Sequence, residues 1–149
     1  MHLKATQSLY SIIGKVGKLL QKEAVCEGEK AGVIPLFGML FRKMRADGMD
    51  CIRMTDVSRQ LMITKPAATQ AVNKLAEKGL VERVHDAHDR RVVYIRPTPE
   101  GNAVFEQELE VRLEFMDRAV NRMGEEDANQ LVVLLDRFLS AVSDELEEE

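Results

Sequence analysis

Apolar side chains recur every three or four residues along most of the chain, which is the period of an amphipathic α-helix. Two such stripes precede residue 47, with the polar stretch Cys26–Gly32 between them. The second stripe stops at the turn Ala46-Asp47-Gly48. Its apolar positions are Leu36, Phe37, Leu40, Phe41 and Met44, and those of the first stripe are Leu9, Ile12, Ile13, Val16, Leu19 and Leu20. The pattern predicts two helices.

Two shorter helices are predicted next. Thr55-Asp56 is the expected N-cap of the first one. Thr64 is the expected N-cap of the second one, because Pro66 then falls in the first turn, where its missing N–H leaves no hydrogen bond unmade. Gly79 stands at the expected C′ position. The apolar face of this second helix comprises Ala68, Ala71, Val72 and Leu75.

After Gly79 the pattern changes. Leu80–His85 and Val92–Arg96 are rich in β-branched residues and predict a hairpin. Thr98-Pro99-Glu100 then opens a long amphipathic helix, which Gly124 separates from a last helix. The chain is therefore expected to be mainly α with a small β-hairpin, an α+β fold.

Two short helices followed by a hairpin form a winged helix-turn-helix. We predict this domain over residues 33–97, an N-terminal dimerisation helix over residues 1–32, and C-terminal dimerisation helices over residues 98–149. One small winged core cannot bury the apolar stripes of the long terminal helices, so pairing of two copies into a homodimer is the economical arrangement. An intramolecular helical bundle is the alternative.

The formal net charge of −4 is unevenly distributed over the 149 residues. Residues 53–96 carry nine Lys/Arg and five Asp/Glu, whereas residues 97–149 carry four and fifteen. For a polyanionic partner the local sign matters more than the total. An ordinary solvated surface with an acidic tail is the alternative interpretation.

Targeting signals are not evident. No run of 18 apolar residues predicts a membrane span, and the N-terminus lacks the apolar region of a signal peptide. The two cysteines do not form a disulfide framework and suit a reducing cytoplasm. We expect a cytoplasmic protein that does not act at a membrane.

The second short helix presents side chains suited to a major groove. Gln70 can make bidentate bonds to adenine, Thr69 can bond base edges or phosphate, and Ala67 can touch a thymine methyl. Lys65 and Lys74 would neutralise phosphates, and the amides behind Thr64 would meet a phosphate at the helix N-terminus. The expected DNA contacts in this region are Thr55, Thr64, Lys65, Pro66, Ala67, Thr69, Gln70, Asn73 and Lys74. Any surface helix also exposes polar residues.

The hairpin tip adds Asp89, Arg90 and Arg91 where a wing would meet the minor groove. The weakly hydrated, planar arginine head suits the concentrated negative potential of a narrow A·T segment. Asp89 lies two residues from Arg91, on the same side of an extended chain, and could hold its guanidinium in a fork. The alternative is a surface salt bridge that only ties the loop.

These motifs together resemble the MarR (multiple antibiotic resistance regulator) family. The resemblance rests on residues 54–61, 63–66 and 72–83, the last of which contain the G-L-V-x-R sequence, on the D-x-x-D-R-R wing at 86–91, and on the T-x-x-G sequence at 98–101. It is densest over residues 54–101, and the helix order extends it along nearly the whole chain.

The resemblance implies a homodimeric regulator of transcription, repressor or activator, that binds a pseudo-palindromic double-stranded DNA operator. It places Arg91 at the wing tip, oriented by Asp89, and Lys65, Thr69 and Gln70 on the recognition helix. It also implies a small-molecule effector, anionic or phenolic, that binds between each winged lobe and the dimer helices. No effector-binding residue follows from this sequence, and no cofactor is expected.

Two residues depart from the family pattern. Met62 occupies the turn position where the family often has glycine, so the turn between the two short helices could be tighter or shifted. Pro97 replaces an apolar residue before Thr98 and should end the second wing strand early.

Other functions have weaker signals. Cys26 or Cys51 could make the chain a cysteine-based redox sensor of the same fold, although Cys26 lies outside the pattern of peroxide-sensing relatives. His85 and His88, with Asp86 and Asp89, could be taken for a metal cluster, but a metal would compete with Arg91 for Asp89. A winged-helix protein-interaction module without DNA binding is a further alternative. The sequence has no phosphate loop and no C-x-x-C, G-x-S-x-G or H-E-x-x-H motif, so we do not expect an enzyme.

Overall fold

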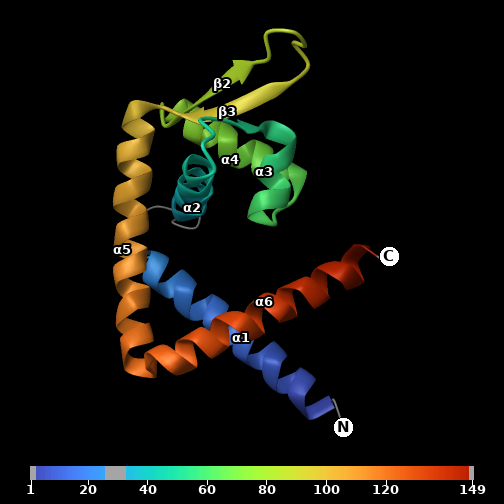
Figure 1. Cartoon of the computed structure of the whole chain (residues 1–149), viewed down its shortest axis with the longest axis vertical. Coiled ribbons are helices and arrows are strands. Elements are labelled where there is room, and N and C mark those ends of the chain that lie inside the picture. The colour runs from blue at the N-terminus through green and yellow to red at the C-terminus, as the bar shows by residue number, and fades with distance from the viewer. Residues whose placement is uncertain (1–2, 26–32, 148–149) are drawn as a thin grey trace. The chain divides into compact units, whose positions relative to one another are not determined.

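The structure is a computed structural model that describes residues 3–25 and 33–147. The predicted polar separator Cys26–Gly32 lies outside the described residues. The chain divides into two compact units, Met1–Leu109 and Glu110–Glu149. The described elements, labelled in Figure 1, are α1 (Leu3–Val25), α2 (Val33–Ala46), β1 (Ile52–Arg53), α3 (Met54–Leu61), α4 (Lys65–Glu77), β2 (Val81–His85), β3 (Val93–Pro97), α5 (Pro99–Met123) and α6 (Glu125–Glu147).

The fold is mainly helical with a small antiparallel sheet, as predicted, but the sheet has a strand that the sequence pattern did not indicate. Its order is β1-β3-β2, so the predicted hairpin gains β1 as a third strand. Ile52 pairs with Ile95, and Arg53 with Tyr94. Two residues are too few to show an alternating pattern, so β1 becomes visible only through its pairing with β3.

Pro97 does not end the second wing strand early. It is the last residue of β3 and pairs with Val81. The Thr98 N–H donates to the Leu80 carbonyl, which makes their pair a hydrogen-bonded one. Hydrogen-bonded and non-hydrogen-bonded pairs alternate in an antiparallel ladder, so the nitrogen of Pro97 points away from β2. On that side β1 pairs only with Tyr94 and Ile95 and does not reach Pro97. The strand therefore tolerates proline at this position.

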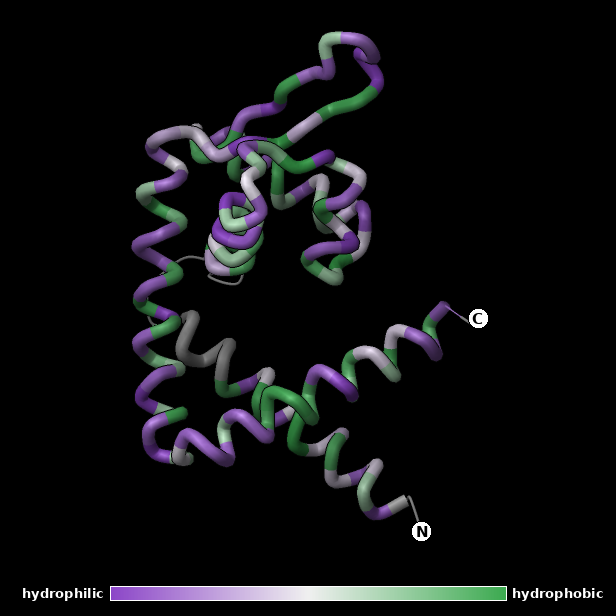
Figure 2. Tube along the Cα trace, in the orientation of Figure 1, coloured by the Kyte–Doolittle hydropathy of each residue, from purple (hydrophilic) through white to green (hydrophobic). Residues whose placement is uncertain are grey.

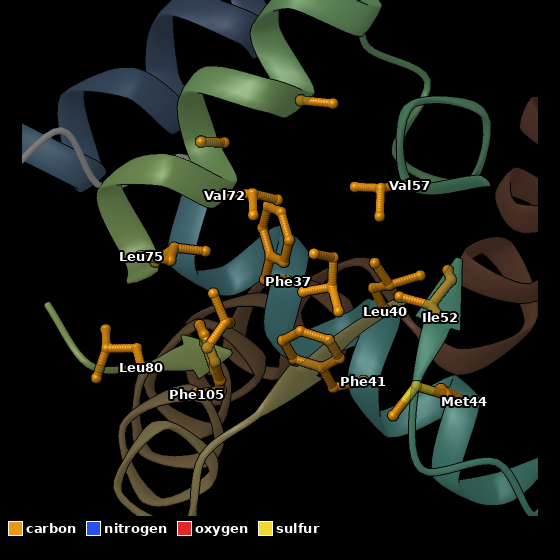
Figure 3. Packing of buried hydrophobic residues seen from close by; sticks show 14 residues of the cluster. Phe37, Leu40, Phe41, Met44, Ile52, Val57, Val72, Leu75, Leu80 and Phe105 are labelled. Carbon is orange, nitrogen blue, oxygen red and sulfur yellow. The ribbon is translucent and has the colours of Figure 1, made fainter. Parts of the chain in front are cut away.

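The core of the first unit lies between α2, α4, the sheet and the start of α5 (Figure 3). Phe37, Phe41 and Phe105 form its centre, with ring centroids 5.1 to 6.5 Å apart. Val57 from α3 and Val72 from α4 are fully buried. Burying each such side chain contributes roughly 1.5–3 kcal/mol, so this cluster fixes α4 against the body of the unit.

Helix α2 packs tightly against the beginning of α5. A Cβ on Gly38 would lie 3.0 Å from the Phe105 carbonyl oxygen, so the two backbones approach closely. At the edge of this contact, Arg42 Nη2 lies 2.7 Å from Glu106 Oε2, and Arg45 bonds the other oxygen of the same carboxylate. The pKa of Glu106 is lowered, chiefly by the hydrogen bond from Arg42. The two arginines thus hold α2 and α5 together by charge as well as by shape.

The junction between α4, β2 and α5 is fixed by backbone contacts. Gly79, with φ of +70°, closes α4 at C′ as predicted. Its carbonyl accepts a 2.7 Å hydrogen bond from Thr98 Oγ1, which in turn accepts one of 2.9 Å from the Gly101 N–H. The Gly79 and Leu80 N–H groups donate back to the last turn of α4. The T-x-x-G sequence therefore joins the end of α4 to the first turn of α5.

Met62 itself takes the left-handed conformation of the α3–α4 turn, with φ of 53° and ψ of 43°. Its N–H donates to the Arg59 carbonyl, and the following Ile63 N–H donates to Ser58. The absence of glycine therefore does not remove the left-handed turn. Methionine at this position carries a side chain that disfavours the left-handed conformation by about 1–2 kcal/mol.

Much of the apolar surface of the long helices is exposed in a single chain. Figure 2 shows hydrophobic residues recurring along α1, α5 and α6. Exposed apolar side chains include Leu9, Ile12, Ile13, Val16 and Leu19 in α1, Val111, Leu113, Met116, Val120 and Met123 in α5, and Leu131, Val132, Val133, Leu134, Leu135, Phe138, Leu139, Val142 and Leu146 in α6. Of the helices in the described part of the chain, none is both long enough and apolar enough to cross a membrane.

Candidate nucleic-acid interface

Helix α4 is well defined at both ends. Thr64 is its N-cap, as predicted, and its Oγ1 accepts a 3.2 Å hydrogen bond from the Ala67 N–H. Pro66 lies in the first turn. At the C-terminal end, the N–H groups of Gly79 and Leu80 bond the carbonyls of Ala76 and Leu75, the pattern of a Schellman cap. Both ends are therefore held by local bonds as well as by the core.

One face of α4 is buried and the other is exposed. The predicted apolar positions Ala68, Ala71, Val72 and Leu75 are all buried. The predicted contact residues on the opposite face are all exposed, namely Lys65, Pro66, Ala67, Thr69, Gln70, Asn73 and Lys74. Gln70 and Asn73 are three residues apart and are therefore neighbours on the surface of the helix. This exposed polar face is what a recognition helix requires.

Two of these side chains already have partners. Thr69 Oγ1 donates to the Lys65 carbonyl at 3.0 Å, one turn back along the helix. Asn73 Oδ1 accepts from the guanidinium of Arg83, which belongs to β2. The hydroxyl oxygen of Thr69 can still accept a bond, and the amide nitrogen of Asn73 can still donate two.

Thr55 is exposed in the first turn of α3, but it is not the N-cap. Helix α3 begins at Met54, its N-cap residue is Arg53, and no side chain caps it by a hydrogen bond. Arg53 is the last residue of β1, so the sheet fixes the start of the helix without a capping side chain. The guanidinium carbon of Arg53 lies 6.0 Å from the centre of the Tyr94 ring, on the strand paired with β1.

At the wing tip, Asp89 and Arg91 form the predicted fork. Arg91 Nε lies 3.1 Å from Asp89 Oδ1, and Arg91 Nη2 lies 3.3 Å from Oδ2. The Arg91 backbone N–H donates to the same carboxylate at 3.0 Å. These bonds lower the pKa of Asp89, the side-chain bond from Arg91 most of all. The Arg91 side chain is 90% exposed, so its head is held in place and remains accessible.

The rest of the tip is tied by its own short-range bonds. Asp86 Oδ1 accepts from the N–H groups of His88 and Asp89, at 2.8 and 3.0 Å. His85 Nδ1 lies 3.2 Å from the carbonyl oxygen of Arg90, whose side chain is exposed. Within the described residues, no three His, Cys, Asp or Glu side chains gather in a geometry that could hold a metal ion.

Comparison with known proteins identifies this arrangement. The sequence profile of the MarR family matches residues 40–92, which include α3, α4 and most of the wing. The HTH-type transcriptional repressor MdtR of Bacillus subtilis (strain 168) is 28% identical over 111 residues, which cover 74% of this chain and 70% of MdtR. These matches confirm the resemblance to the MarR family.

Solved structures share its fold. The structure of an S. aureus MepR–DNA complex superposes with a TM-score of 0.72 at 21% identity, covering 93% of this chain and 97% of MepR. The PcaV transcriptional regulator from Streptomyces coelicolor, in complex with its natural ligand, superposes with a TM-score of 0.72 at 19% identity, covering 95% and 96%. The winged helix-turn-helix fold predicted from the sequence is thereby confirmed.

The surroundings of Cys51 give little support to redox chemistry at that thiol. Cys26 lies outside the described residues. Cys51 is a half-buried free thiol just before β1. Burial raises its pKa, and Asp50 adds to the effect. A raised pKa lowers the fraction of thiolate, which is the reactive form.

Sequence reasoning did not assign a role to Arg83, the arginine of the G-L-V-x-R sequence. It faces α4 from β2, although it is distant from the recognition helix along the predicted hairpin. Its place on the core face of the sheet becomes visible only through its pairing with buried Ile95, so local periodicity gave no cue.

Proposed function

We propose that this chain is a transcriptional regulator that binds double-stranded DNA as a homodimer. Each α4 would enter a major groove, and each wing would contact the adjoining minor groove. The observation that carries the proposal is the wing fork, because it orients an almost fully exposed arginine on the hairpin that follows a capped helix with a polar outer face. A salt bridge that only ties the loop does not need that exposure.

The residues divide into three roles. Gln70 would read a base edge, and Ala67 would contact a thymine methyl. Other residues would position the protein on the phosphate backbone through charge, hydroxyls and the N–H groups of the first helical turns. They are Thr55, Thr64, Lys65, Pro66 and Lys74, with Thr69 and Arg90 close to the backbone. Arg91, held by Asp89, would enter the minor groove.

The dimer is supported by the exposed apolar faces of α1, α5 and α6. Fifteen or more exposed apolar side chains on long helices exceed what a monomer usually leaves in water. A two-fold axis would bury them and present two recognition helices to a pseudo-palindromic operator, with half-sites about 10 bp apart. The relative MdtR is named a repressor, and we propose repression as the mode of action here.

We further propose that a small molecule adjusts the DNA affinity. Solved relatives include PcaV with its natural ligand bound. In this chain an apolar cleft of about 380 Å³ lies beside β1 and the start of α3, with Leu40, Met44, Ile52 and Tyr94 among its lining. A cavity of this size suits a small organic molecule. A ligand there would touch α3 directly, and through it the turn into α4.

The experiment is selection of duplex fragments from the source genome by the full-length protein, followed by binding titrations at two salt concentrations. The Arg91→Ala variant should lose roughly 1–3 kcal/mol of affinity for the selected site. Arg96→Ala is the matched control, because it removes the same charge from the same hairpin but at a position paired with Glu82.

Each outcome has a distinct meaning. An enriched inverted repeat, weakened by Arg91→Ala and not by Arg96→Ala, supports the proposal. Equal affinity of wild type and Arg91→Ala would refute the wing assignment. Failure of the wild-type protein to bind DNA, with reductant and with candidate effectors, would favour the protein-interaction module instead.

A further inference from the structure

Arg83 and Asn73 connect the wing to the recognition helix. Arg83 belongs to β2, which packs against α4 (Figure 1). It pairs with Ile95, whose side chain is fully buried, so Arg83 lies on the sheet face that is turned toward α4. From there its Nη2 donates to Asn73 Oδ1 on the exposed face of α4.

This bond determines which way the Asn73 amide faces. A guanidinium carries only donors, so it can bond the carbonyl oxygen of an amide but not its NH₂ group. Turning the Asn73 amide over would place donors against donors. With its oxygen bound to Arg83, Asn73 offers an approaching DNA base the two N–H bonds of Nδ2. Gln70 lies next to it on the helix, and its amide is free to offer both a donor and an acceptor.

The difference matters for base recognition. An asparagine or glutamine recognises adenine by accepting from N6 and donating to N7, which uses both ends of the amide. Guanine presents the acceptors N7 and O6 in the major groove, and thymine presents O4. A donor-only Asn73 fits those edges and loses half of the adenine pair.

We infer that Arg83 is a specificity-determining positioning residue, which restricts Asn73 to an acceptor edge, guanine or thymine, in each half-site. The inference rests on the proposed DNA binding. Arg83 acts through Asn73, and the base-reading atom is Asn73 Nδ2. A residue of the wing strand thereby changes the base preference of the recognition helix.

The test is selection from a duplex library randomised over the half-site, with full-length wild type, Arg83→Met and Arg96→Met. Arg83→Met removes the donors and retains an unbranched apolar stem. It should raise adenine at one half-site position by about tenfold relative to guanine and thymine, because each bidentate pair discriminates by that order. Arg96→Met removes the same charge on the other face of the hairpin, where Arg96 Nε bonds Glu82 at 2.8 Å, and should leave that position unchanged.

A second variant guards against misfolding of the first. Asn73→Asp keeps an acceptor for Arg83 and removes the NH₂ donors, so it should abolish the preference for guanine or thymine at the same position. If Arg83→Met weakens all sequences equally and shifts no base preference, Arg83 is only a phosphate contact and the inference is wrong. An unchanged preference in Asn73→Asp overturns it as well. If wild type selects no sequence at all, the failure lies with the proposed DNA binding.

Discussion

A Cβ on Gly101 would stand 1.8 Å from the carbonyl oxygen of Leu80. No side chain can occupy that space, because the obstructing oxygen belongs to the Leu80 backbone, just before β2, and cannot rotate away. The first turn of α5 therefore sits directly on the segment that joins α4 to β2, and the T-x-x-G sequence has a steric reason for its glycine.

Gly101→Ala should lower the free energy of unfolding by about 3 kcal/mol, the upper end of the usual cost of overpacking, because the added methyl group forces the two backbones apart. Urea unfolding followed by circular dichroism measures the loss. Thr98→Val is the companion variant: it keeps the shape of the side chain and removes both hydroxyl hydrogen bonds, for an expected loss of about 1–3 kcal/mol. An unchanged urea midpoint for Gly101→Ala would contradict the close approach.

Met62→Gly should stabilise the protein by up to about 1 kcal/mol. The left-handed conformation disfavours methionine by about 1–2 kcal/mol, and the greater freedom of glycine in the unfolded chain offsets part of that gain. Gly79→Ala is the opposite experiment, because Gly79 has φ of +70° in open space, and it should destabilise by about 1 kcal/mol. Thermal unfolding that moves both variants in the same direction would count against the strain at Met62.

The Arg42–Glu106 pair should make stability depend on pH in acid. Arg42 lowers the pKa of Glu106 below its ordinary value of 4.5, so the carboxylate stabilises the folded state above that pH. Its contribution is lost as the pH falls through the lowered pKa. Glu106→Gln should cost up to about 1 kcal/mol at neutral pH, since the pair is partly exposed and screened, and progressively less below about pH 4.5.

Unfolding titrations between pH 3 and pH 7 measure this dependence. In an Arg42→Met background the lowering of the Glu106 pKa loses its main cause, and the effect of Glu106→Gln should become smaller and flatter. A Glu106→Gln effect that grows as the pH falls has the wrong sign for this mechanism.

The sequence predicted the helices and the recognition face because those features repeat. Ala68, Ala71, Val72 and Leu75 form a stripe that only a helix can bury on one side. The Asp89–Arg91 fork was predicted from the spacing of extended chain, but Arg90 and Arg91 lie in a turn that the Val92 N–H closes onto the Asp89 carbonyl, so the prediction held for another reason.

What the sequence missed depends on contacts between distant segments. The N-cap of α3 is Arg53 and not Thr55, because the pairing of β1 with β3 determines where that helix starts. Pro97 stays in its strand because β1 is short. The bond from Arg83 to Asn73 joins two elements that local periodicity treats separately.

Asp89→Asn should separate the orientation of Arg91 from its positive charge. It keeps an oxygen acceptor but loses the charge that holds Arg91, so affinity for the selected site should fall by about 1 kcal/mol. The dependence of binding on salt should persist, because no phosphate-contacting cation is removed. Asp56→Asn is the control, since it breaks a similar exposed pair, with Arg59, on α3 and not at the wing tip. Equal losses for the two variants would argue against a specific fork.

Leu134→Lys should convert the dimer to monomer. Leu134 is 59% exposed in a single chain, and a charge in its place would have to be buried in the proposed dimer interface. Sedimentation velocity measures the change in mass, and titration with operator DNA should show a parallel loss of tight binding. Asn129→Lys adds the same charge at an exposed polar position of α6 and should remain dimeric. A monomeric wild-type protein would exclude the dimer directly.

The loop at the wing tip also determines which of its positions are free to vary. Asp86 accepts from two backbone N–H groups, and Asp89 holds Arg91 by backbone and side chain, so these residues fix the path of the loop. Ala87 and His88 are exposed between them. A fluorophore or an altered pair of side chains could be placed there without rebuilding the turn, because the bond that His88 makes to Asp86 uses its backbone N–H. The wing thus has a natural attachment point next to the arginine whose contacts such a reporter would detect.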